Sequence, residues 1–404
     1  MQRRNGIIIV GSLLLIGLLL GAFIWQDQQT QQEIAATLTA SGGSTLSVAR
    51  AVRGQDDQSF ARVTEPRPFS FPADHGPHRE YRTEWWYLTG NLKSADGRHF
   101  GYQLTFFRQG LRPDSPERES SWAAQEVYLA HLGLTDVANN RFYAADQLAR
   151  GGSIGLAGAQ AEPFRVFLKD WSIEGTGENA RLRAASDEVA IDLQVRALKP
   201  PTLQGDRGFS QKGPEPGNAT YYYSFTRMQT SGTLQIAGQP ITVEGLSWLD
   251  REWGTSLLSE DVVGWDWFSL QLADGRDIMW YILRRTDGTP ETRYSRGTVT
   301  GPNGEVESLA SDEVEVEVLD TWLSPHTGAR YPAHWRLRIP RLELDLDLRP
   351  HIPDQELRVG FQYWEGAVAI SGTSSDQPIS GNGYVELTGY VDLVGADQPA
   401  LTNP

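Results

Sequence analysis

The sequence contains no cysteine, and only 36 of its 404 residues are lysine or arginine, against 51 aspartates and glutamates. The lack of cysteine excludes disulfide bonds, thiolate zinc sites and cysteine nucleophiles. The formal net charge of -15 argues against nucleic acid or an anionic lipid surface as a direct partner. What the chain has instead is aromatic residues, 13 Trp, 14 Tyr and 14 Phe, which suit both β-strands and apolar ligand sites. Its length is sufficient for two domains, each with an apolar core.

Long apolar runs are also scarce, and the clear one covers residues 7–25. This run is uncharged and about long enough for a membrane-spanning helix. Arg3 and Arg4 precede it and the next basic residue is Arg50, so the positive-inside rule leaves residues 1–6 in the cytoplasm. We predict a single-pass anchor in the cytoplasmic membrane, with the body in the periplasm or on the extracellular side. The alternative is a cleaved signal peptide, because a small-residue stretch follows the run.

The rest of the chain divides into a linker and a β-rich body. Residues 26–66 are rich in Gln, Ser, Thr and Gly without a sustained period, which is typical of a flexible linker. Beyond them, short runs of alternating apolar and polar residues recur between turn signals, which predicts β-strands. The clearest alternation is at 342–348, where leucines interleave with acidic residues. No comparable helical period follows residues 7–25, so the body is predicted to be all-β.

An internal repeat divides the body into two similar halves. A Trp-rich strand, the turn Ala-Asp-Gly-Arg and a second aromatic strand occur at 85–107 and again at 265–283. The Asp-Gly pair supplies the positive φ that a tight hairpin needs. We predict two tandem antiparallel β-barrels, a larger one at 67–255 and a leaner one at 256–404. The alternative is that Asp-Gly turns, which are common in β proteins, recur here by chance.

Barrels of this size typically bind a ligand. Closed antiparallel barrels hold one small apolar molecule in the mouth, so we expect a hydrophobic small molecule as the partner. The residues expected to contact it are aromatic or lie beside aromatic residues: Glu84, Trp85, Trp86, Tyr222, Arg251, Trp253, Trp265, Trp267 and Trp280. Strand alternation puts Trp265 and Trp267 on one face and Asp266 on the other. The alternative is that these rings only form the core.

Three residues are candidates for acid–base chemistry. Asp250 and Glu252 flank Arg251 at the predicted join between the two domains, which is therefore the first place where we expect function. The cluster is either a buried ion network or a catalytic floor, and an acid there would need a pKa raised by burial, which Arg251 would oppose. His131 lies on a strand among apolar neighbours. It is a third candidate if its side faces the barrel interior, and otherwise a hydrogen-bonded core histidine.

One stretch has side chains of the metal-ligand type. His75, His78 and Glu80 lie close together in the sequence, but the Gly-Pro pair between the histidines makes a turn and supplies no third fixed ligand. We therefore predict no metal and no other cofactor.

A series of Trp-, Asp- and Gly-rich motifs runs from about Arg79 to the C-terminus. The motifs are Glu84-Trp85-Trp86-Tyr87, Ala130-His131, Ser247-Trp248-Leu249-Asp250-Arg251-Glu252-Trp253-Gly254, Trp265-Asp266-Trp267, Tyr363-Trp364-Glu365-Gly366 and Gly383-Tyr384-Val385-Glu386-Leu387-Thr388-Gly389-Tyr390. Together they resemble the AttH/CrtC family. The resemblance implies a tandem lipocalin-like fold, exported in bacteria. Members of that family include carotenoid 1,2-hydratases, proteins encoded beside ABC-transporter genes and proteins labelled secreted hydrolases.

The sequence departs from the hydratase branch of this family at two places. That branch tends to have His-Asn-Trp after the motif aspartate, whereas Asp250 is followed by Arg251-Glu252-Trp253. It also uses an acidic residue on the strand after the second hairpin, where this chain has the apolar residues 278–282. The resemblance therefore supports the fold more than it supports carotenoid hydration.

Three functional hypotheses follow. The first is an extracytoplasmic protein that binds a hydrophobic or isoprenoid-like small molecule and exchanges it with an ABC transporter. The second is a cofactor-free hydratase, cyclase or hydrolase acting on such a ligand, with Asp250, Glu252 and His131 as its acid and base groups. The third is a structural subunit of a transporter assembly, with its barrels filled by side chains.

Overall fold

The computed structural model describes residues 59–112, 125–151, 155–255 and 258–391, all within one compact unit, Ser47–Pro404. The regular secondary structure of this part of the chain is almost entirely β-strand, which confirms the prediction of an all-β body. Its helices are short 3-10 turns: η1 (Ala73–His75), η2 (Ser311–Glu313) and η3 (Pro340–Leu342). None of these described helices has the length and apolar character to cross a membrane. The predicted anchor at 7–25 lies outside the described residues.

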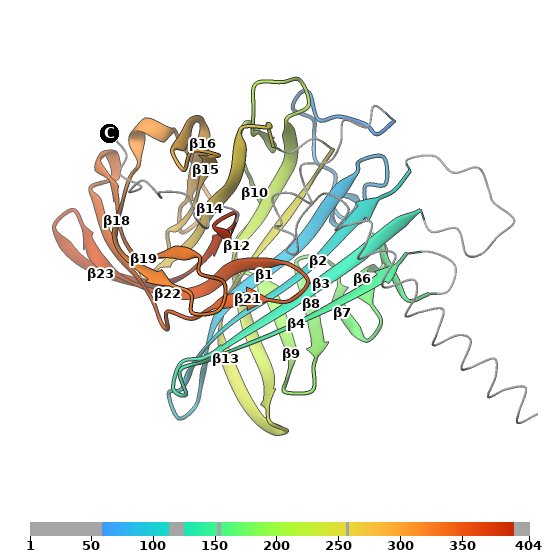
Figure 1. Ribbon diagram of the computed structural model, residues 1–404, viewed down its shortest axis with the longest axis horizontal. Coiled ribbons are helices and arrows are strands. Elements are labelled where there is room, and N and C mark those ends of the chain that lie inside the picture. The colour runs from blue at the N-terminus through green and yellow to red at the C-terminus, as the bar shows by residue number, and fades with distance from the viewer. Residues whose placement is uncertain (1–58, 113–124, 152–154, 256–257, 392–404) are drawn as a thin grey trace, which may run out of the picture. The chain divides into compact units, whose positions relative to one another are not determined.

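The first sheet contains 13 strands. They are β1 (Thr83–Ser94), β2 (His99–Gly110), β3 (Glu126–Asp136), β4 (Arg141–Arg150), β5 (Ala157–Gln160), β6 (Phe164–Leu168), β7 (Trp171–Gly175), β8 (Asn179–Ala185), β9 (Val189–Ala197), β10 (Thr202–Leu203), β11 (Phe209–Gln211), β12 (Ala219–Ile236) and β13 (Gln239–Gly254). The main order is β4-β3-β2-β1-β13-β12-β9-β8-β7-β6-β5. Strand β6, near one end of this order, contacts β3 and β4 at the other, so the sheet curls nearly into a barrel (Figure 1).

The second sheet contains ten strands. They are β14 (Val262–Leu272), β15 (Asp277–Arg285), β16 (Pro290–Thr300), β17 (Val306–Leu309), β18 (Glu315–Leu323), β19 (Arg330–Ile339), β20 (Leu344–Pro350), β21 (Glu356–Arg358), β22 (Gln362–Ser374) and β23 (Gln377–Leu387). The leucine alternation begins at Leu344, because Leu342 ends η3. Leu344, Leu346 and Leu348 are buried in the core of this sheet.

The predicted repeat is visible in the strand order. In the first sheet the hairpin β1–β2 joins the hairpin β12–β13 through β1 and β13, and in the second sheet β14–β15 joins β22–β23 through β14 and β23. Gly97 and Gly275 occupy the matching hairpin turns with φ of 87° and 91°, the conformation for which glycine is suited. The first sheet ends at Gly254 and the second begins at Val262. The division into two domains at residue 255 stays a prediction.

The two sheets pack against each other through their hairpin strands. Strand β1 contacts β23, β2 contacts β22, and β12 contacts both β14 and β15. Figure 1 shows the strands of the second sheet, in gold, orange and red, beside those of the first. A side chain on β1, β2, β12 or β13 therefore points either into the core of the first sheet or toward the second sheet. This choice decides which residues form the candidate site.

Candidate ligand pocket between the sheets

A pocket lies where the two sheets meet. Its lining comes from β1, β2, β12 and β13 on one side, from β14, β15, β22 and β23 on the other, and from the segments after β11 and β13, which supply Lys212 and Leu258. The full lining is Trp85, Tyr87, Thr105, Phe107, Lys212, Tyr222, Asp250, Glu252, Leu258, Trp265, Trp267, Tyr281, Leu283, Glu365 and Glu386. About 710 Å³ between these residues is unfilled, including space open to solvent, and about 60 Å³ of it is accessible to the centre of a water molecule. The pocket is therefore narrow, and its lining combines aromatic side chains with a few polar and charged groups.

Strand alternation explains which side chains reach the pocket. Asp250 and Glu252 on β13 face it, whereas Arg251 between them points into the first sheet, where it lies over the ring of Trp86. On β1, Trp85 faces the pocket for the same reason. The cluster of opposite charges expected from the sequence is thus divided between two faces. Because the guanidinium group of Arg251 lies on the other face of the strand, its positive charge does not hold down the pKa of Asp250.

Asp250 is buried and accepts three hydrogen bonds. Ser224 Oγ donates to Oδ1 at 2.5 Å and Trp248 Nε1 donates to the same oxygen at 2.7 Å. The Tyr222 hydroxyl donates to Oδ2 and itself accepts from Trp267 Nε1 at 3.1 Å. Burial outweighs these hydrogen bonds and raises the pKa of Asp250 to about 7. The group is therefore poised to give or take a proton near neutral pH.

Glu252 is held by the ammonium group of Lys212. The Lys212 Nζ lies 3.0 Å from Glu252 Oε1, and Thr220 also donates to that oxygen. The same ammonium lies 4.1 Å from the ring centroid of Tyr281. Burial lowers the pKa of Lys212, but attraction to Glu252 more than offsets this and the pKa is raised. This pair is the charged part of the pocket lining.

The second sheet contributes two more carboxyl groups, which face each other across β22 and β23. Glu365 and Glu386 are directly paired in the strand register. Glu386 Oε2 accepts from Trp265 Nε1 at 3.1 Å, and Glu365 Oε2 accepts from the Tyr87 hydroxyl at 2.8 Å. Glu365 Oε1 is buried and has no hydrogen-bond partner among the described residues. Burial raises the pKa of Glu386 to about 8, so this carboxyl keeps a proton at neutral pH, and burial also raises the pKa of Glu365 well above its usual value.

The pocket brings together six of the residues expected from the sequence: Trp85, Tyr222, Asp250, Glu252, Trp265 and Trp267. Trp280 does not reach it, because it lies on the other face of β15 in the core of the second sheet. Glu84, Trp86, Arg251 and Trp253 also lie away from it, on the core side of the first sheet.

The sequence analysis left open that His131 faces the interior of the first barrel. It does not. Its neighbours Ala130 and Leu132 take that side, and His131 points toward the second sheet, where Nδ1 lies 2.8 Å from the Tyr363 hydroxyl. Burial lowers the pKa of His131 to about 3, so the imidazole is neutral. It packs behind Phe107, with 5.5 Å between ring centroids, and does not line the pocket.

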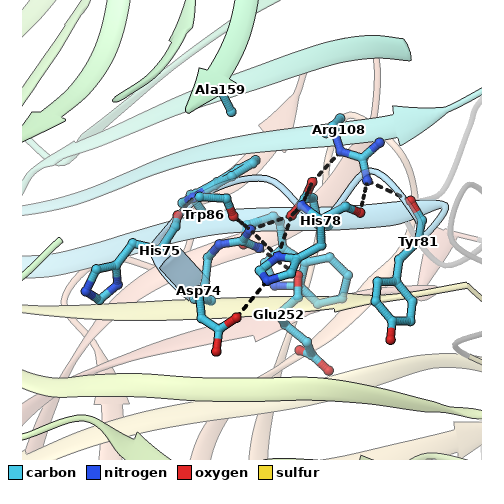
Figure 2. Close-up of polar contacts among 12 residues, drawn as sticks. Asp74, His75, His78, Tyr81, Trp86, Arg108, Ala159 and Glu252 are labelled. Atoms are coloured by element: carbon cyan, nitrogen blue, oxygen red, sulfur yellow. Dashed lines mark hydrogen bonds and ion pairs between the residues drawn. The ribbon is translucent and has the colours of Figure 1, made fainter. Parts of the chain in front are cut away.

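A buried ion network occupies the core side of the first sheet. Glu84 binds the guanidinium groups of both Arg108 and Arg251. His78 bridges Glu84 to Asp74, with Nε2 at 3.1 Å from Asp74 Oδ1. Figure 2 shows Asp74 hydrogen-bonded to the ring of His78, and Arg108 bonded to the backbone carbonyl of the same residue. The ring of His78 also stacks on Trp253 at 3.8 Å, so this cluster is a structural ion network.

His75 and His78, whose side chains are of the metal-ligand type, have separate partners. The Nδ1 of His75 lies 2.6 Å from the Tyr223 hydroxyl, whereas His78 belongs to the ion network. Within the described ranges, no group of three or more His, Cys, Asp or Glu residues is arranged to hold a metal ion.

The sequence analysis missed several residues of the pocket. Among them are Tyr87, Lys212, Tyr281, Glu365 and Glu386. A signal for the two glutamates is present in the sequence, since each interrupts an otherwise apolar strand, Trp364-Glu365-Gly366 and Val385-Glu386-Leu387. A charged residue at such a position is buried at a cost unless it has a function or a partner.

Comparisons with known proteins agree with this architecture. The AttH-like family profile matches residues 62–390. The chain is similar to a solved AttH-like protein from Nitrosomonas europaea, with 34% identity and a TM-score of 0.73 over 82% of this chain and 100% of that one. It is also similar to kievitone hydratase from Nectria haematococca, with 19% identity and a TM-score of 0.61 over 83% and 98% of the two chains. No match is found among curated proteins.

Proposed function

The chain belongs to the AttH-like family, and from that premise we propose that it binds a hydrophobic small molecule in the pocket between its two sheets. The observation that carries the proposal is the composition of the walls. Aromatic side chains from both sheets, among them Trp85, Phe107, Trp265 and Trp267, line unfilled space together with a few polar groups. Ligand sites are typically built in this way, with apolar walls for affinity and few polar groups for orientation. The proposal includes the interpretation of both sheets as lipocalin-like barrels.

Binding is tested with N-phenyl-1-naphthylamine, a neutral dye whose fluorescence rises in apolar surroundings. We expect saturable binding that weakens about tenfold in Trp265→Ala, because a wall of aromatic contact is lost. Trp322→Ala is the matched control, since Trp322 is also a partly buried indole of the second sheet but does not line the pocket. Absence of dye binding, or equal loss in the two variants, would contradict the proposal.

A second candidate function is acid–base catalysis on the bound molecule. Two observations favour it: the pKa of Asp250 is near 7 and Glu386 is protonated at neutral pH. One neutral acid and one carboxylate can together add water to an alkene. The acid gives its proton to one carbon, water adds to the other carbon, and the proton released by that water returns to a carboxylate. Kievitone hydratase, which shares the fold, is by name a hydratase.

The catalytic candidate is tested separately from binding. The protein is incubated with a panel of hydrophobic alkenes and tertiary alcohols, and mass spectrometry records gain or loss of one water. Asp250→Asn should abolish any such product while the dye still binds. A product that persists in this variant would exclude Asp250 as the acid or base. No product from any compound would leave binding as the function.

The location of the protein is a separate proposal. The uncharged run at 7–25 supports an anchor in the cytoplasmic membrane with the body outside it. Cell fractionation with protease protection tests this, and recovery of the full chain in the cytosol would contradict it. Association with an ABC transporter stays a prediction.

A further inference from the structure

The pocket contains an excess of acidic groups that its own cation does not compensate. Four carboxyl groups line it, those of Asp250, Glu252, Glu365 and Glu386, against the single ammonium group of Lys212. That ammonium is engaged by Glu252 at 3.0 Å. Within the described lining, three carboxyl groups therefore face the pocket without a positive partner. Excess negative charge in a buried site is costly, and the site avoids it by keeping protons.

Glu365 is the carboxyl group of the pocket with the fewest polar contacts of its own. Its Oε1 is buried and lacks a hydrogen-bond partner among the residues that the structure describes, although buried polar atoms are nearly always paired. Its cross-strand neighbour is Glu386, and like groups directly opposite on a sheet repel when both are charged. A positive charge placed between the two carboxylates would attract both of them and offset their mutual repulsion.

The aromatic lining already holds one cation. The Lys212 ammonium lies 4.1 Å from the ring centroid of Tyr281 and 5.2 Å from that of Tyr222. Trp85, Trp265 and other aromatic side chains line the same pocket. Aromatic side chains combined with carboxyl groups are the usual arrangement for recognising ammonium ligands. The negative face of each ring attracts the positive charge in a site from which water is largely excluded.

We propose that the ligand of this pocket is a hydrophobic amine or quaternary ammonium compound, with its positive charge placed near Glu365 and Glu386. This inference rests on the proposed function, since it names the chemical class of the molecule bound there. The apolar part of the ligand packs on the tryptophans. Its cation favours the ionised form of the two glutamates over the protonated form that burial favours, so binding releases protons to solvent.

The test compares two compounds that differ in charge but not in shape, benzyltrimethylammonium and neopentylbenzene. Isothermal titration calorimetry near neutral pH should give at least about tenfold tighter binding of the cation, the selectivity expected from a desolvated charge contact. The heat of cation binding should also depend on the ionisation enthalpy of the buffer, because protons are released. The titratable groups lining the pocket around Glu386 are Tyr87, Lys212, Tyr222, Asp250, Glu252, Tyr281 and Glu365.

Two variants assign the selectivity to the glutamates. In Glu386→Gln and in Glu365→Gln the ratio of the two affinities should fall about tenfold, and the buffer dependence should decrease. The control is Glu343→Gln, since Glu343 is exposed and caps the turn of η3; this variant should retain the selectivity.

The outcomes separate this inference from the proposed function. Equal affinity for the two compounds, or selectivity unchanged in both glutamine variants, would overturn the inference. If the neutral dye still binds and competes with either compound, the proposed function stands. If neither the dye nor either compound binds, the proposed function fails and the inference fails with it.

Discussion

Glu84 is the acid on which the ion network of the first sheet depends. Burial alone would raise the pKa of its carboxyl, but Arg108 and Arg251 hold that pKa well below its usual value. A neutral glutamine would leave both guanidinium groups buried without a counter-charge, and removing one partner of a buried ion pair costs about 3 to 5 kcal/mol. We expect Glu84→Gln to lower the free energy of unfolding by a similar amount, measured by urea denaturation.

The matched control is a solvent-exposed ion pair on the protein surface. The side chains of Arg141 and Glu188 pair on the surface and are 55% and 61% exposed. Glu188→Gln should change the free energy of unfolding by less than about 1 kcal/mol, since exposed pairs are solvated and screened. Equal losses in the two variants would contradict the structural role of Glu84.

Asp250 should give stability an unusual pH dependence. Its pKa rises from 3.8 to about 7 on burial, so between these values the folded chain keeps a proton that the unfolded chain has lost. The contribution of this group to stability is therefore full below the lower value, falls as the pH rises through the window, and is constant above it. Asp250→Asn has no proton to lose, so its free energy of unfolding should fall less steeply with pH. Identical slopes in variant and native chain would show that Asp250 ionises normally.

At the level of strands, alternation predicts which residues share a face but not which partner that face meets. Trp265 and Trp267 lie on one face of β14, as expected, and Asp266 on the other face pairs with Arg284. The sequence also groups Asp250 with Arg251 because they are adjacent. In a strand, adjacency means opposite faces, and only the packing of the second sheet shows that one of them faces a pocket.

Glu365 and Glu386 could not be paired from local pattern alone. Their apposition depends on the register of β22 and β23, which the turn at Ser375 and Asp376 fixes, both with positive φ. A Ser-Asp turn is a weaker signal than the Asp-Gly turns of the repeat, so the sequence analysis did not use it. The turn sets the register that places Glu365 opposite Glu386, and no sequence motif indicates this pairing.

A bulge in β12 ties the first sheet to the second. The strand register shifts between Phe225 and Met228, and both intervening side chains reach Asp277 on β15: Thr226 Oγ1 at 2.9 Å and Arg227 Nη2 at 2.6 Å. Bulges redirect side chains in this way. Lys199 Nζ, between β9 and β10, also lies 2.6 Å from Asp277. One fully buried carboxylate thus joins three side chains, from two segments of the first sheet, to the second sheet.

Asp277→Asn should weaken the coupling between the sheets, because buried Lys199 and partly buried Arg227 lose their counter-charge. We expect a loss of about 3 to 5 kcal/mol in the free energy of unfolding, and two resolved transitions in differential scanning calorimetry where the native chain gives one. Asp274→Asn, in the neighbouring turn with a side chain 38% exposed, is the control and should melt as the native chain does. A single transition in Asp277→Asn would show that other contacts hold the sheets together.

At the scale of the whole molecule, the sequence predicts the repeat and the importance of the join, but not how the join is built. The hairpin turns and the order of strands agree with the predicted repeat, and Asp250 and Glu252 do line the pocket. The contributions of β22 and β23 are distant in the sequence and depend on how one sheet packs on the other. That packing has no periodic signal, because it is determined by the shapes of two complete faces.

A pocket with walls from both sheets should stabilise them together when it is filled. A ligand that binds only the folded state adds about 2.7 kcal/mol at a concentration 100 times its dissociation constant. Two unfolding transitions are expected in Asp277→Asn. Saturating N-phenyl-1-naphthylamine should raise the midpoint temperatures of both and bring the two midpoints together, as measured by calorimetry. The same dye should leave the two transitions apart in Asp277→Asn combined with Trp265→Ala. A shift of only one transition would show that the dye contacts a single sheet, and would place its site within one barrel.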